Sequence, residues 1–219
     1  MQDNIRVEKE RKFWDNLSPE YDQFIEKNWK IYRSSLLDKI SSDVTVGDTV
    51  LEVACGTGLV ALKVAERVSE VYGIDISSPM IEEAKKKVEE KGIANVEFSV
   101  HDAYALPFGN DIFDTVICNN ALHNMKEPRK ALSEIKRVLK PGGRFIAVIV
   151  GIGESRKYKF GMTIYHLFGG KLPVFYKLSL DESADMIKES GFTVVNKEII
   201  KHPEDKMPLV YIVAEKGGK

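Results

Sequence analysis

The sequence is short of the features that mark secreted and membrane-spanning proteins. Only two of its 219 residues are cysteine, Cys55 and Cys118, which is too few for a disulfide framework, and we expect both thiols to be reduced. No run approaches the roughly 18 consecutive apolar residues that a membrane-spanning helix needs. The segment MQDNIRVEKERK lacks the apolar core of a signal peptide. We therefore expect a cytoplasmic protein with no transmembrane segment.

An excess of charge of either sign is also absent. Lys and Arg total 32 and Asp and Glu total 33, which gives a net charge of −1 and no overall basic field to attract nucleic acid. Histidines and carboxylates do not cluster at the spacing of metal ligands, so we expect no metal site. Hydrophobic residues make up 43% of the chain, and no internal repeat interrupts it. This length and composition suit one α/β domain over residues 1–219.

The most informative stretch that is present is Val50–Leu59, VLEVACGTGL. Its apolar beginning is typical of a buried strand, the glycines Gly56 and Gly58 turn the chain, and apolar residues then recur with helical spacing. This layout lets a ligand lie against bare backbone at the start of a helix. A carboxylate such as Glu52 is costly in a buried strand unless a cation or a hydrogen-bond donor meets it. The loop is therefore expected to receive a ligand with a positive end.

Two classes of ligand fit this stretch. The spacing Gly56-x-Gly58-x-x-Ala61 also matches the dinucleotide-binding pattern, and Asp75 follows at about the 20-residue distance of a ribose-binding acid. A nicotinamide-dependent oxidoreductase is therefore an alternative, and a turn that binds no ligand is another. The rest of the chain has to decide among them.

Short apolar runs alternate with amphipathic helical patterns after this unit. The alternation predicts an α/β fold, with a parallel sheet and helices on both of its faces. Ser78-Pro79 predicts a helix start, Gly92 a helix end, and Ser179-x-x-Glu182 a capping box. Pro141-Gly142-Gly143 is expected to break a helix before the fifth strand. Further strands are expected at residues 71–76, 95–100, 113–118, 144–150, 192–200 and 209–214.

The segments on either side of this core are expected to shape the site. Three helices are expected before residue 45, the last of them over Trp29–Ile40. They either cover an edge of the sheet or form a lid in which Trp14 or Tyr21 closes over the ligand. Residues 151–178 are rich in aromatic side chains and break the alternation of strands and helices.

Polar residues follow the expected carboxyl ends of four successive strands. These are Glu52 with the glycines, Asp75, Asp102, and the run from Asn119 to His123. Functional residues of open α/β sheets gather at this edge. A carboxylate at Asp75 suits a ribose diol, and Asp102 can accept from the exocyclic amine of adenine. The pattern predicts a nucleoside with a cationic tail and no phosphate.

Five motifs in order carry a resemblance to a known family: VLEVACGTG, YGIDIS, HDAYALPF, FDTVICNNALHNM and EIKRVLKPGG. Together they resemble the class I S-adenosylmethionine-dependent methyltransferases, particularly the group of ubiquinone and menaquinone C-methyltransferases. The resemblance implies a Rossmann-like, mostly parallel seven-stranded sheet. It also implies four segments: a helical cap (1–44), a donor-binding core (45–150), an acceptor-side insert (151–178), and a closing helix and strands (179–219).

The resemblance further implies S-adenosyl-L-methionine as the cofactor and S-adenosyl-L-homocysteine as its product. Asp75 would hold the ribose hydroxyls, Asp102 the adenine amine, and Glu52 with the glycines the methionine moiety. The cofactor-binding candidates are Tyr21, Glu52, Ala54, Gly56, Gly58, Asp75, Ile76, Met80, Asp102, Ala103, Asn119 and Leu122. By the same sheet order, Cys55 and Cys118 would lie near each other beneath the donor pocket.

The chemistry expected is direct displacement of the methyl group onto a small-molecule acceptor, apolar or aromatic in character. A base is needed only if the acceptor must lose a proton, and His123 is the first candidate, against the alternative that it only packs. Tyr165 and His166 are weaker candidates. The NPPY-type signature of nucleic-acid methyltransferases is absent, so no nucleic acid is expected as a partner. A non-catalytic donor-binding module is a further alternative, and either a monomer or a homodimer is compatible with the sequence.

Overall fold

The computed structural model describes residues 2–29, 35–167, 174–205 and 207–218. Their centre is a seven-stranded sheet with the strand order β3-β2-β1-β4-β5-β7-β6. The strands β1 to β5 pair in parallel, whereas β7 runs antiparallel to both β5 and β6. The strands are β1 (Thr49–Val53), β2 (Glu70–Asp75), β3 (Val96–Val100), β4 (Phe113–Asn119), β5 (Leu139–Val150), β6 (Phe192–Ile200) and β7 (Leu209–Lys216). The predicted α/β class and mostly parallel sheet are confirmed.

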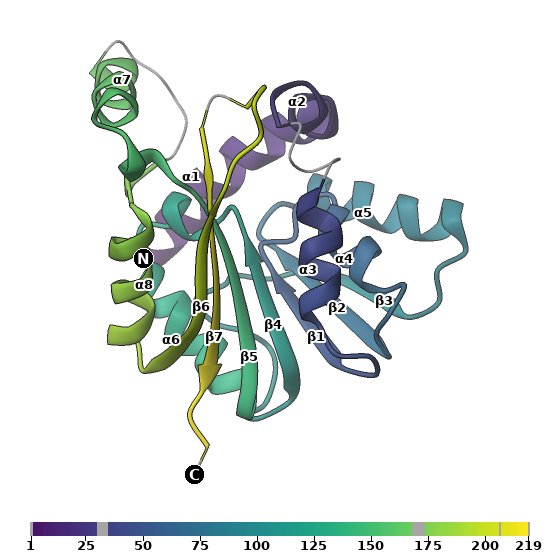
Figure 1. Ribbon diagram of the computed structural model, residues 1–219. Coiled ribbons are helices and arrows are strands. Elements are labelled where there is room, and N and C mark those ends of the chain that lie inside the picture. Colours follow the sequence, from purple (N-terminus) through teal and green to yellow (C-terminus); the bar gives the residue numbers. More distant parts are fainter. Residues whose placement is uncertain (1, 30–34, 168–173, 206, 219) are drawn as a thin grey trace.

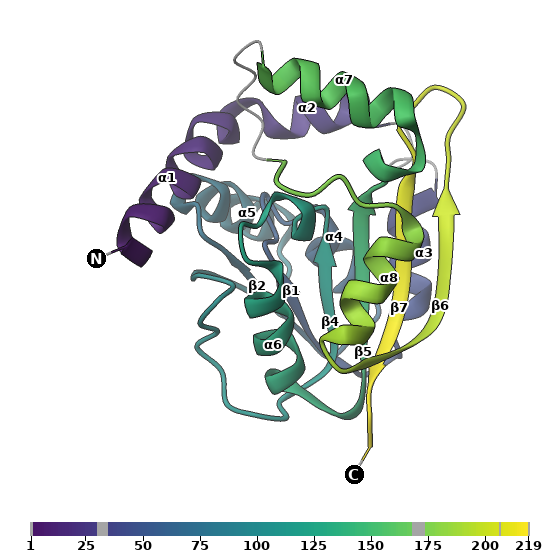
Figure 2. The ribbon, with the colours of Figure 1, turned by 90° about the vertical axis from the view of Figure 1, so that its left-hand side faces the viewer.

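Helices cover both faces of this sheet (Figures 1 and 2). One face is covered by α3 (Leu37–Asp43), α4 (Leu59–Val64) and α5 (Ser78–Lys91), and the other by α6 (Pro128–Val138) and α8 (Leu180–Glu189). Successive strand residues enter opposite cores, because side chains alternate across a sheet. Val50 thus packs with α3 and α4, whereas Leu51 packs with α6.

A third group of helices lies across the carboxyl ends of the parallel strands (Figures 1 and 2). It consists of α1 (Gln2–Leu17), α2 (Tyr21–Asn28) and α7 (Arg156–Leu167), together with the short turns η1 (Ser18–Glu20), η3 (Leu122–Asn124) and η4 (Ile152–Glu154). The helix expected over Trp29–Ile40 falls partly outside the described residues. Because this group of helices covers the carboxyl ends of the strands, it lies next to the edge of the sheet where the polar residues gather.

Two element boundaries differ from the sequence expectations. The side chain of Ser77, not Ser78, caps α5 by accepting from the Met80 amide, and Pro79 sits in the first turn. Leu139, expected on the preceding helix, begins β5, which therefore starts before Pro141. Leu139 pairs with Phe113, and the ladder then shifts register before it continues, so the glycines form an irregular start of the strand.

The other helix signals match the structure. Gly92 ends α5 in the left-handed conformation, and Ser179 and Glu182 form the expected capping box of α8. Within the described ranges, none of the helices combines the length and apolar character needed to cross a bilayer.

Candidate active site

The turn between β1 and α4 contains three residues with positive φ: Ala54, Gly56 and Gly58. A Cβ atom at Gly58 would lie 2.6 Å from Cζ of Phe98, so this glycine permits close packing of the turn against β3. A Cβ atom at Gly56 would meet the ring of Tyr21 at an ordinary 3.5 Å. A side chain at Gly56 would therefore be in ordinary contact with Tyr21, whereas Gly58 is tightly enclosed by protein.

Glu52 is buried beneath this turn. Its Oε2 accepts a hydrogen bond of 2.8 Å from the amide of Ala61, at the start of α4. Burial raises the pKa of the Glu52 carboxyl well above its ordinary value, although the Ala61 amide acts in the opposite direction. The sequence predicted that a cation or a hydrogen-bond donor would meet the Glu52 carboxylate. In the structure this partner is the backbone amide of Ala61, and Glu52 makes no ion pair among the described residues.

Asp75 ends β2 and holds the turn in place. Its Oδ2 accepts from the Gly56 amide and its Oδ1 from the Ser77 amide, each at 2.9 Å. Burial raises the pKa of the Asp75 carboxyl, against the effect of these amides. The Ile76 amide is a further backbone donor that lowers the pKa of this carboxyl. Asp75 therefore accepts from three backbone amides.

The next two strand ends contribute an acid and two amides. Asp102 follows β3, and its Oδ1 accepts from the Tyr104 amide at 3.0 Å. Asn119 ends β4, and Asn120 follows it in the left-handed conformation, with φ of 52°. The backbone N–H of Asn120 donates to the backbone carbonyl of Val148 at 2.8 Å, which connects this turn to β5.

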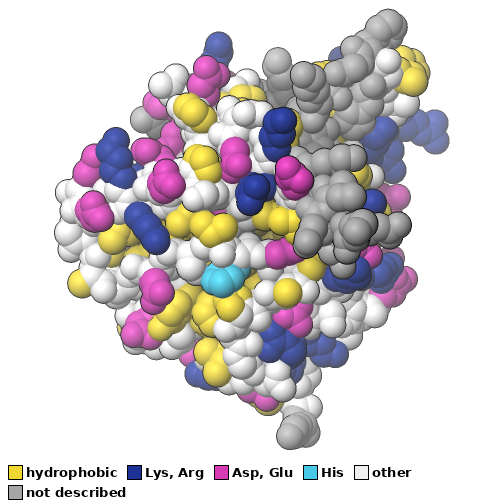
Figure 3. All heavy atoms as spheres, turned by 180° about the vertical axis from the view of Figure 1, so that it is seen from behind, with side chains coloured by type: hydrophobic (Ala, Val, Ile, Leu, Met, Phe, Trp, Pro, Cys, Tyr) yellow, Lys and Arg dark blue, Asp and Glu magenta, His cyan; other side chains and the backbone are white. Residues whose placement is uncertain are grey.

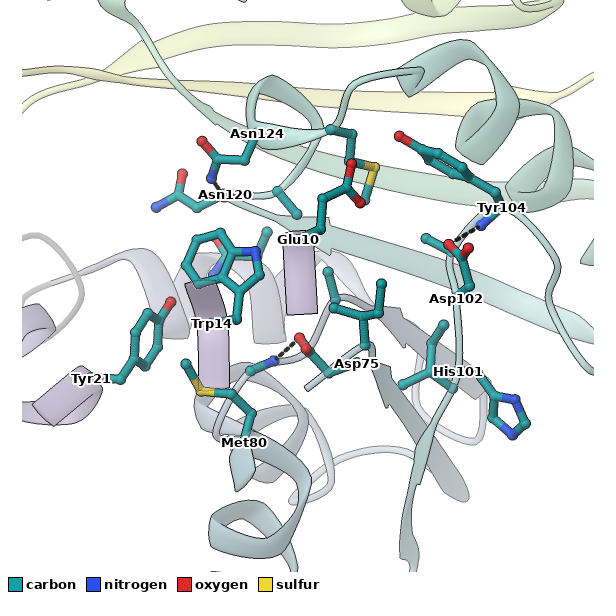
Figure 4. Close-up of a pocket in the computed structure, with 18 residues that line it drawn as sticks. Glu10, Trp14, Tyr21, Asp75, Met80, His101, Asp102, Tyr104, Asn120 and Asn124 are labelled. Atoms are coloured by element: carbon teal, nitrogen blue, oxygen red, sulfur yellow. Dashed lines mark hydrogen bonds between the residues drawn. The ribbon is translucent and has the colours of Figure 1, made fainter. Parts of the chain in front are cut away.

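These strand ends surround one hollow, of about 740 Å³ including its open mouth (Figure 4). Nine of the predicted cofactor-binding residues line it: Tyr21, Ala54, Gly56, Asp75, Ile76, Met80, Asp102, Ala103 and Asn119. Figure 4 shows Trp14 and Glu10, both from α1, directed into the space between Asp75 and Asn120. The first hollow is therefore closed on one side by α1, which agrees with the lid interpretation of this helix.

Three predicted cofactor-binding residues do not line this first hollow. Glu52 lies in a small adjoining recess together with Tyr21 and Asn119. Gly58 packs against Phe98 as described above, and Leu122 is fully buried in the core shared with α6. Leu122 borders the site only through its neighbour His123.

Several lining residues were not foreseen from the sequence. They are Glu10, Ile74, His101, Tyr104, Asn124 and Met125, whereas Asn120 and Ala121 fall in the predicted run from Asn119 to His123. A signal for Glu10 was available, because Glu10, Trp14 and Leu17 are spaced to share one face of a helix. The histidine His101, by contrast, turns its ring away from the centre of the hollow in Figure 4.

A second, larger hollow of about 1090 Å³ adjoins the first. The two share Trp14, Tyr21, Asn120 and Asn124. The lining of the second hollow is mainly apolar and comes from five segments: α1 with α2, the turn after β4, the end of β5 with η4, α7 with Val174, and the loop between β6 and β7. Its remaining lining residues are Leu17, Phe24, Ile25, Lys27, Asn28, Trp29, His123, Val150, Ile152, Met162, Val174, Glu204 and Met207. A polar hollow and an apolar hollow thus meet at four side chains.

His123 belongs to the second hollow. It is only 3% exposed, and its Nδ1 finds no hydrogen-bond partner in the part of the chain that the structure describes. Burial lowers the pKa of the imidazole to about 4. The ring is therefore neutral at pH 7, and it can accept or donate a hydrogen bond inside an apolar cavity.

The insert lines the second hollow as expected, but not with its aromatic residues. The contributions come from Ile152, Met162 and Val174, whereas Phe160, Tyr165 and Phe175 are exposed. Tyr165 therefore lies away from the hollow, and the side chain of His166 falls outside the described residues. The aromatic walls come from the amino-terminal helices instead.

The cysteines are both buried, Cys55 in the turn after β1 and Cys118 on the neighbouring strand β4, and they pack in different cores. Cys55 packs in the core with α4 and α5, whereas Cys118 packs in the core with α6. Their proximity stays a prediction. Among the described residues, no three His, Cys, Asp or Glu side chains gather in a way that could hold a metal ion.

Solved structures share this fold over most of the chain. Magnesium protoporphyrin IX methyltransferase from Synechocystis PCC 6803 matches with a TM-score of 0.74 at 20% identity, covering 94% of this chain and 98% of that one. The YcgJ protein of Bacillus subtilis matches with a TM-score of 0.69 at 22% identity, covering 84% and 98%. The fold, with its polar hollow at the strand ends, is that of the Rossmann-like methyltransferases.

Sequence comparison identifies the family. Residues 51–147 match the methyltransferase domain family. A demethylmenaquinone methyltransferase of Geobacillus kaustophilus (strain HTA426) is 32% identical over 175 residues, which cover 70% of this chain and 74% of that protein. An uncharacterized methyltransferase, YcgJ of Bacillus subtilis (strain 168), is 41% identical over 99 residues, which cover 45% of this chain and only 39% of that protein.

The chain belongs to the S-adenosylmethionine-dependent methyltransferase family. Its cofactor is accordingly S-adenosyl-L-methionine, and the glycine pattern does not mark a nicotinamide-dependent oxidoreductase. The acceptor is not identified by family membership.

Proposed function

We propose that this protein transfers a methyl group from S-adenosyl-L-methionine to an apolar small molecule and releases S-adenosyl-L-homocysteine. The observation that carries the proposal is the meeting of two unlike hollows at Trp14, Tyr21, Asn120 and Asn124. A nucleoside donor suits the polar hollow, an apolar acceptor suits the other, and only at their junction can the two ligands touch.

The residues of the first hollow suit the adenosine part of the donor. Asp75 is assigned to the ribose hydroxyls, because its carboxylate lines the first hollow and can accept hydrogen bonds from hydroxyl groups. Asp102 is the acceptor for the adenine amine, with Ile76 and Ala103 against the base. Gly56 has no side chain and lines the first hollow, so a ligand there can approach its backbone closely.

The methionine end is assigned to the recess at Glu52. An ammonium group nearby would favour the ionised carboxylate and so oppose the effect of burial on its pKa. Asn119 lines both this recess and the first hollow. Gly58 supports this end indirectly, by letting the turn pack against Phe98.

The sulfonium of the donor supplies a methyl group that is already activated for displacement. The protein must then align the acceptor and exclude water. Trp14 and Tyr21 are suited to this because each faces both hollows. Burial, with Asp75 and Glu52 nearby, raises the pKa of Tyr21, so its hydroxyl keeps its proton.

The acceptor is assigned to the second hollow, with His123 as the general base where the acceptor must lose a proton. The support is geometric: a neutral imidazole with an unpartnered nitrogen is buried in this hollow. The relatives named demethylmenaquinone methyltransferases support an acceptor with an apolar ring. Proton removal by neutral His123 would fail as the pH falls toward 4, where the imidazole is itself protonated.

Isothermal titration calorimetry with S-adenosyl-L-homocysteine tests the donor site. We expect binding of this compound and none of NAD. Asp75→Ala should weaken the affinity by about 1–3 kcal/mol, because hydrogen-bonding groups are left unpaired. Asp185→Ala, an exposed acid on α8, is the matched control and should leave the affinity unchanged.

An unchanged affinity for Asp75→Ala would remove Asp75 from the site, and binding of NAD alone would overturn the proposal. Turnover is tested separately with a broad panel of acceptors. Donor binding without methyl transfer to any acceptor would favour a non-catalytic donor-binding module.

A further inference from the structure

Helix α7 presents an exposed apolar stripe. Phe160 is 67% exposed, Ile164 36% and Leu167 73%. Their spacing of four and three residues places them on one side of the helix. Tyr158 and Met162, by contrast, pack inward against the protein core. The stripe is therefore an outer face of α7 that the described part of the chain leaves uncovered.

The charges of α7 all have one sign. The segment Arg156–Leu167 contains Arg156, Lys157 and Lys159 and no acidic residue. Lys159 pairs with Glu182 at 3.5 Å, whereas Arg156 and Lys157 are exposed and make no ion pair within the described ranges. Figure 3 shows a different pattern on the face seen from behind, where basic and acidic side chains are interspersed. α7 thus combines exposed apolar side chains with a local positive charge.

Helix α2 adds one exposed apolar side chain at the same end of the sheet. Phe24 is 39% exposed and also lines the second hollow, which Met162 of α7 lines from the other side. Both helices stand at the same end of the sheet (Figures 1 and 2). The docking face, defined as Phe24, Arg156, Lys157, Phe160, Ile164 and Leu167, is therefore continuous with the apolar hollow.

We propose that the docking face binds the surface of a lipid bilayer that carries anionic headgroups. Helices that lie in a bilayer interface combine Phe and Leu on one side with Lys and Arg beside them, and they are drawn by apolar burial together with attraction to anionic lipid. The docking face has this combination, and its positive charge complements the negative headgroups. Docking in this way would bring the apolar hollow next to the lipid, whatever the acceptor is.

Co-sedimentation with vesicles tests the apolar part. Phosphatidylcholine vesicles with added phosphatidylglycerol should bind the full chain, and pure phosphatidylcholine vesicles should bind it much less. Phe160→Ser/Leu167→Ser should lower binding to the anionic vesicles by at least tenfold. Val46→Ser is the matched control, because Val46 is also 73% exposed but lies before β1, at the opposite end of the strands.

The charge part is tested with Arg156→Glu/Lys157→Glu, which should abolish the preference for anionic vesicles. Lys85→Glu/Lys86→Glu, an exposed adjacent pair on α5, should retain it. Affinity for S-adenosyl-L-homocysteine, unchanged in all four variants, shows that each is folded.

Three results would overturn the proposal. One is the absence of binding to either kind of vesicle. Another is equal binding by the docking-face variants and their controls. The third is a dimer of the wild-type chain, measured by analytical ultracentrifugation, that the docking-face substitutions dissociate, because a second copy would then be the occupant of this face.

Discussion

The two glycines of the β1–α4 turn are required for different physical reasons. Gly56 adjoins the open hollow, whereas a side chain at Gly58 would collide with Phe98 and approach Ala84 at 3.2 Å. Both adopt positive φ, which L side chains adopt only with strain. The sequence motif shows two glycines alike, and only the packing around them distinguishes their roles.

Gly58→Ala should therefore destabilise the protein by more than backbone strain alone. Gly142→Ala is the matched control, because Gly142 has a nearly equal φ of 75° but nothing within 4 Å of the added Cβ atom. We expect about 1–2 kcal/mol from the strain common to both substitutions. Overpacking at Gly58 should add about 1–3 kcal/mol. Urea unfolding measures both, and equal losses would show that Phe98 moves aside without cost.

His123 should make stability depend on pH. Its pKa in the folded protein is about 4, below the ordinary 6.5, so the unfolded chain binds a proton at a higher pH than the native state does. The free energy of unfolding should therefore fall as the pH drops from about 6.5 to about 4, by up to about 3 kcal/mol. The contribution is fully present above that window.

Denaturant unfolding of wild type and His123→Gln at a series of pH values measures this. The free energy of unfolding of wild type minus that of His123→Gln should fall on acidification, because the variant has no imidazole to protonate. A difference that does not vary with pH would mean that the ring is solvated and titrates normally. The comparison within one pair cancels the opposite contributions of Glu52 and Asp75, whose pKa values are raised.

At the scale of elements, a few polar contacts hold the amino-terminal helices α1 and α2 against the core. Asp22 of α2 accepts from the Thr57 hydroxyl at 2.5 Å and pairs with Lys87 of α5. Asp15 of α1 accepts from the Ser77 hydroxyl at 2.7 Å. These contacts join α1 and α2 to the very turns that surround the first hollow.

Asp22→Ala should loosen the cap without unfolding the sheet. We expect a loss of about 1–2 kcal/mol in the contact between cap and core, since a hydrogen bond and an ion pair are removed together. Proteolysis within α1 and α2 should become faster, and affinity for S-adenosyl-L-homocysteine weaker. Asp38→Ala, which removes only the exposed pair with Lys63, should change neither. A cap that resists proteolysis equally in both variants would show that apolar packing alone holds it.

The alternation of strands and helices could be predicted, because elements that are buried in two cores have a regular local pattern of apolar residues. The short apolar runs, the cap at Ser179 and the left-handed Gly92 all act within a few residues. The start of β5 could not be predicted, since Leu139 is positioned by Phe113 on a neighbouring strand. Spacing alone also says nothing about strand order, which entered only through the family resemblance.

At the scale of the whole molecule, the strand-end acids were predictable and the second hollow was not. A parallel sheet brings its carboxyl ends to one edge, so Asp75 and Asp102 could be placed together from the sequence. The second hollow depends on five distant segments, including Glu204 and Met207 in a loop without periodicity. The aromatic composition of residues 151–178 predicted the wrong side chains as the walls of the second hollow, because composition does not tell which side of α7 faces inward.

The two hollows share lining side chains, so no protein segment would separate the proposed donor from the proposed acceptor. With donor and acceptor placed as proposed, a methyl group would pass directly from one molecule to the other, without a methylated enzyme in between. Initial rates measured against both substrates should give double-reciprocal lines that intersect, as in a sequential mechanism. Parallel lines would reveal a methylated enzyme that waits for its second substrate.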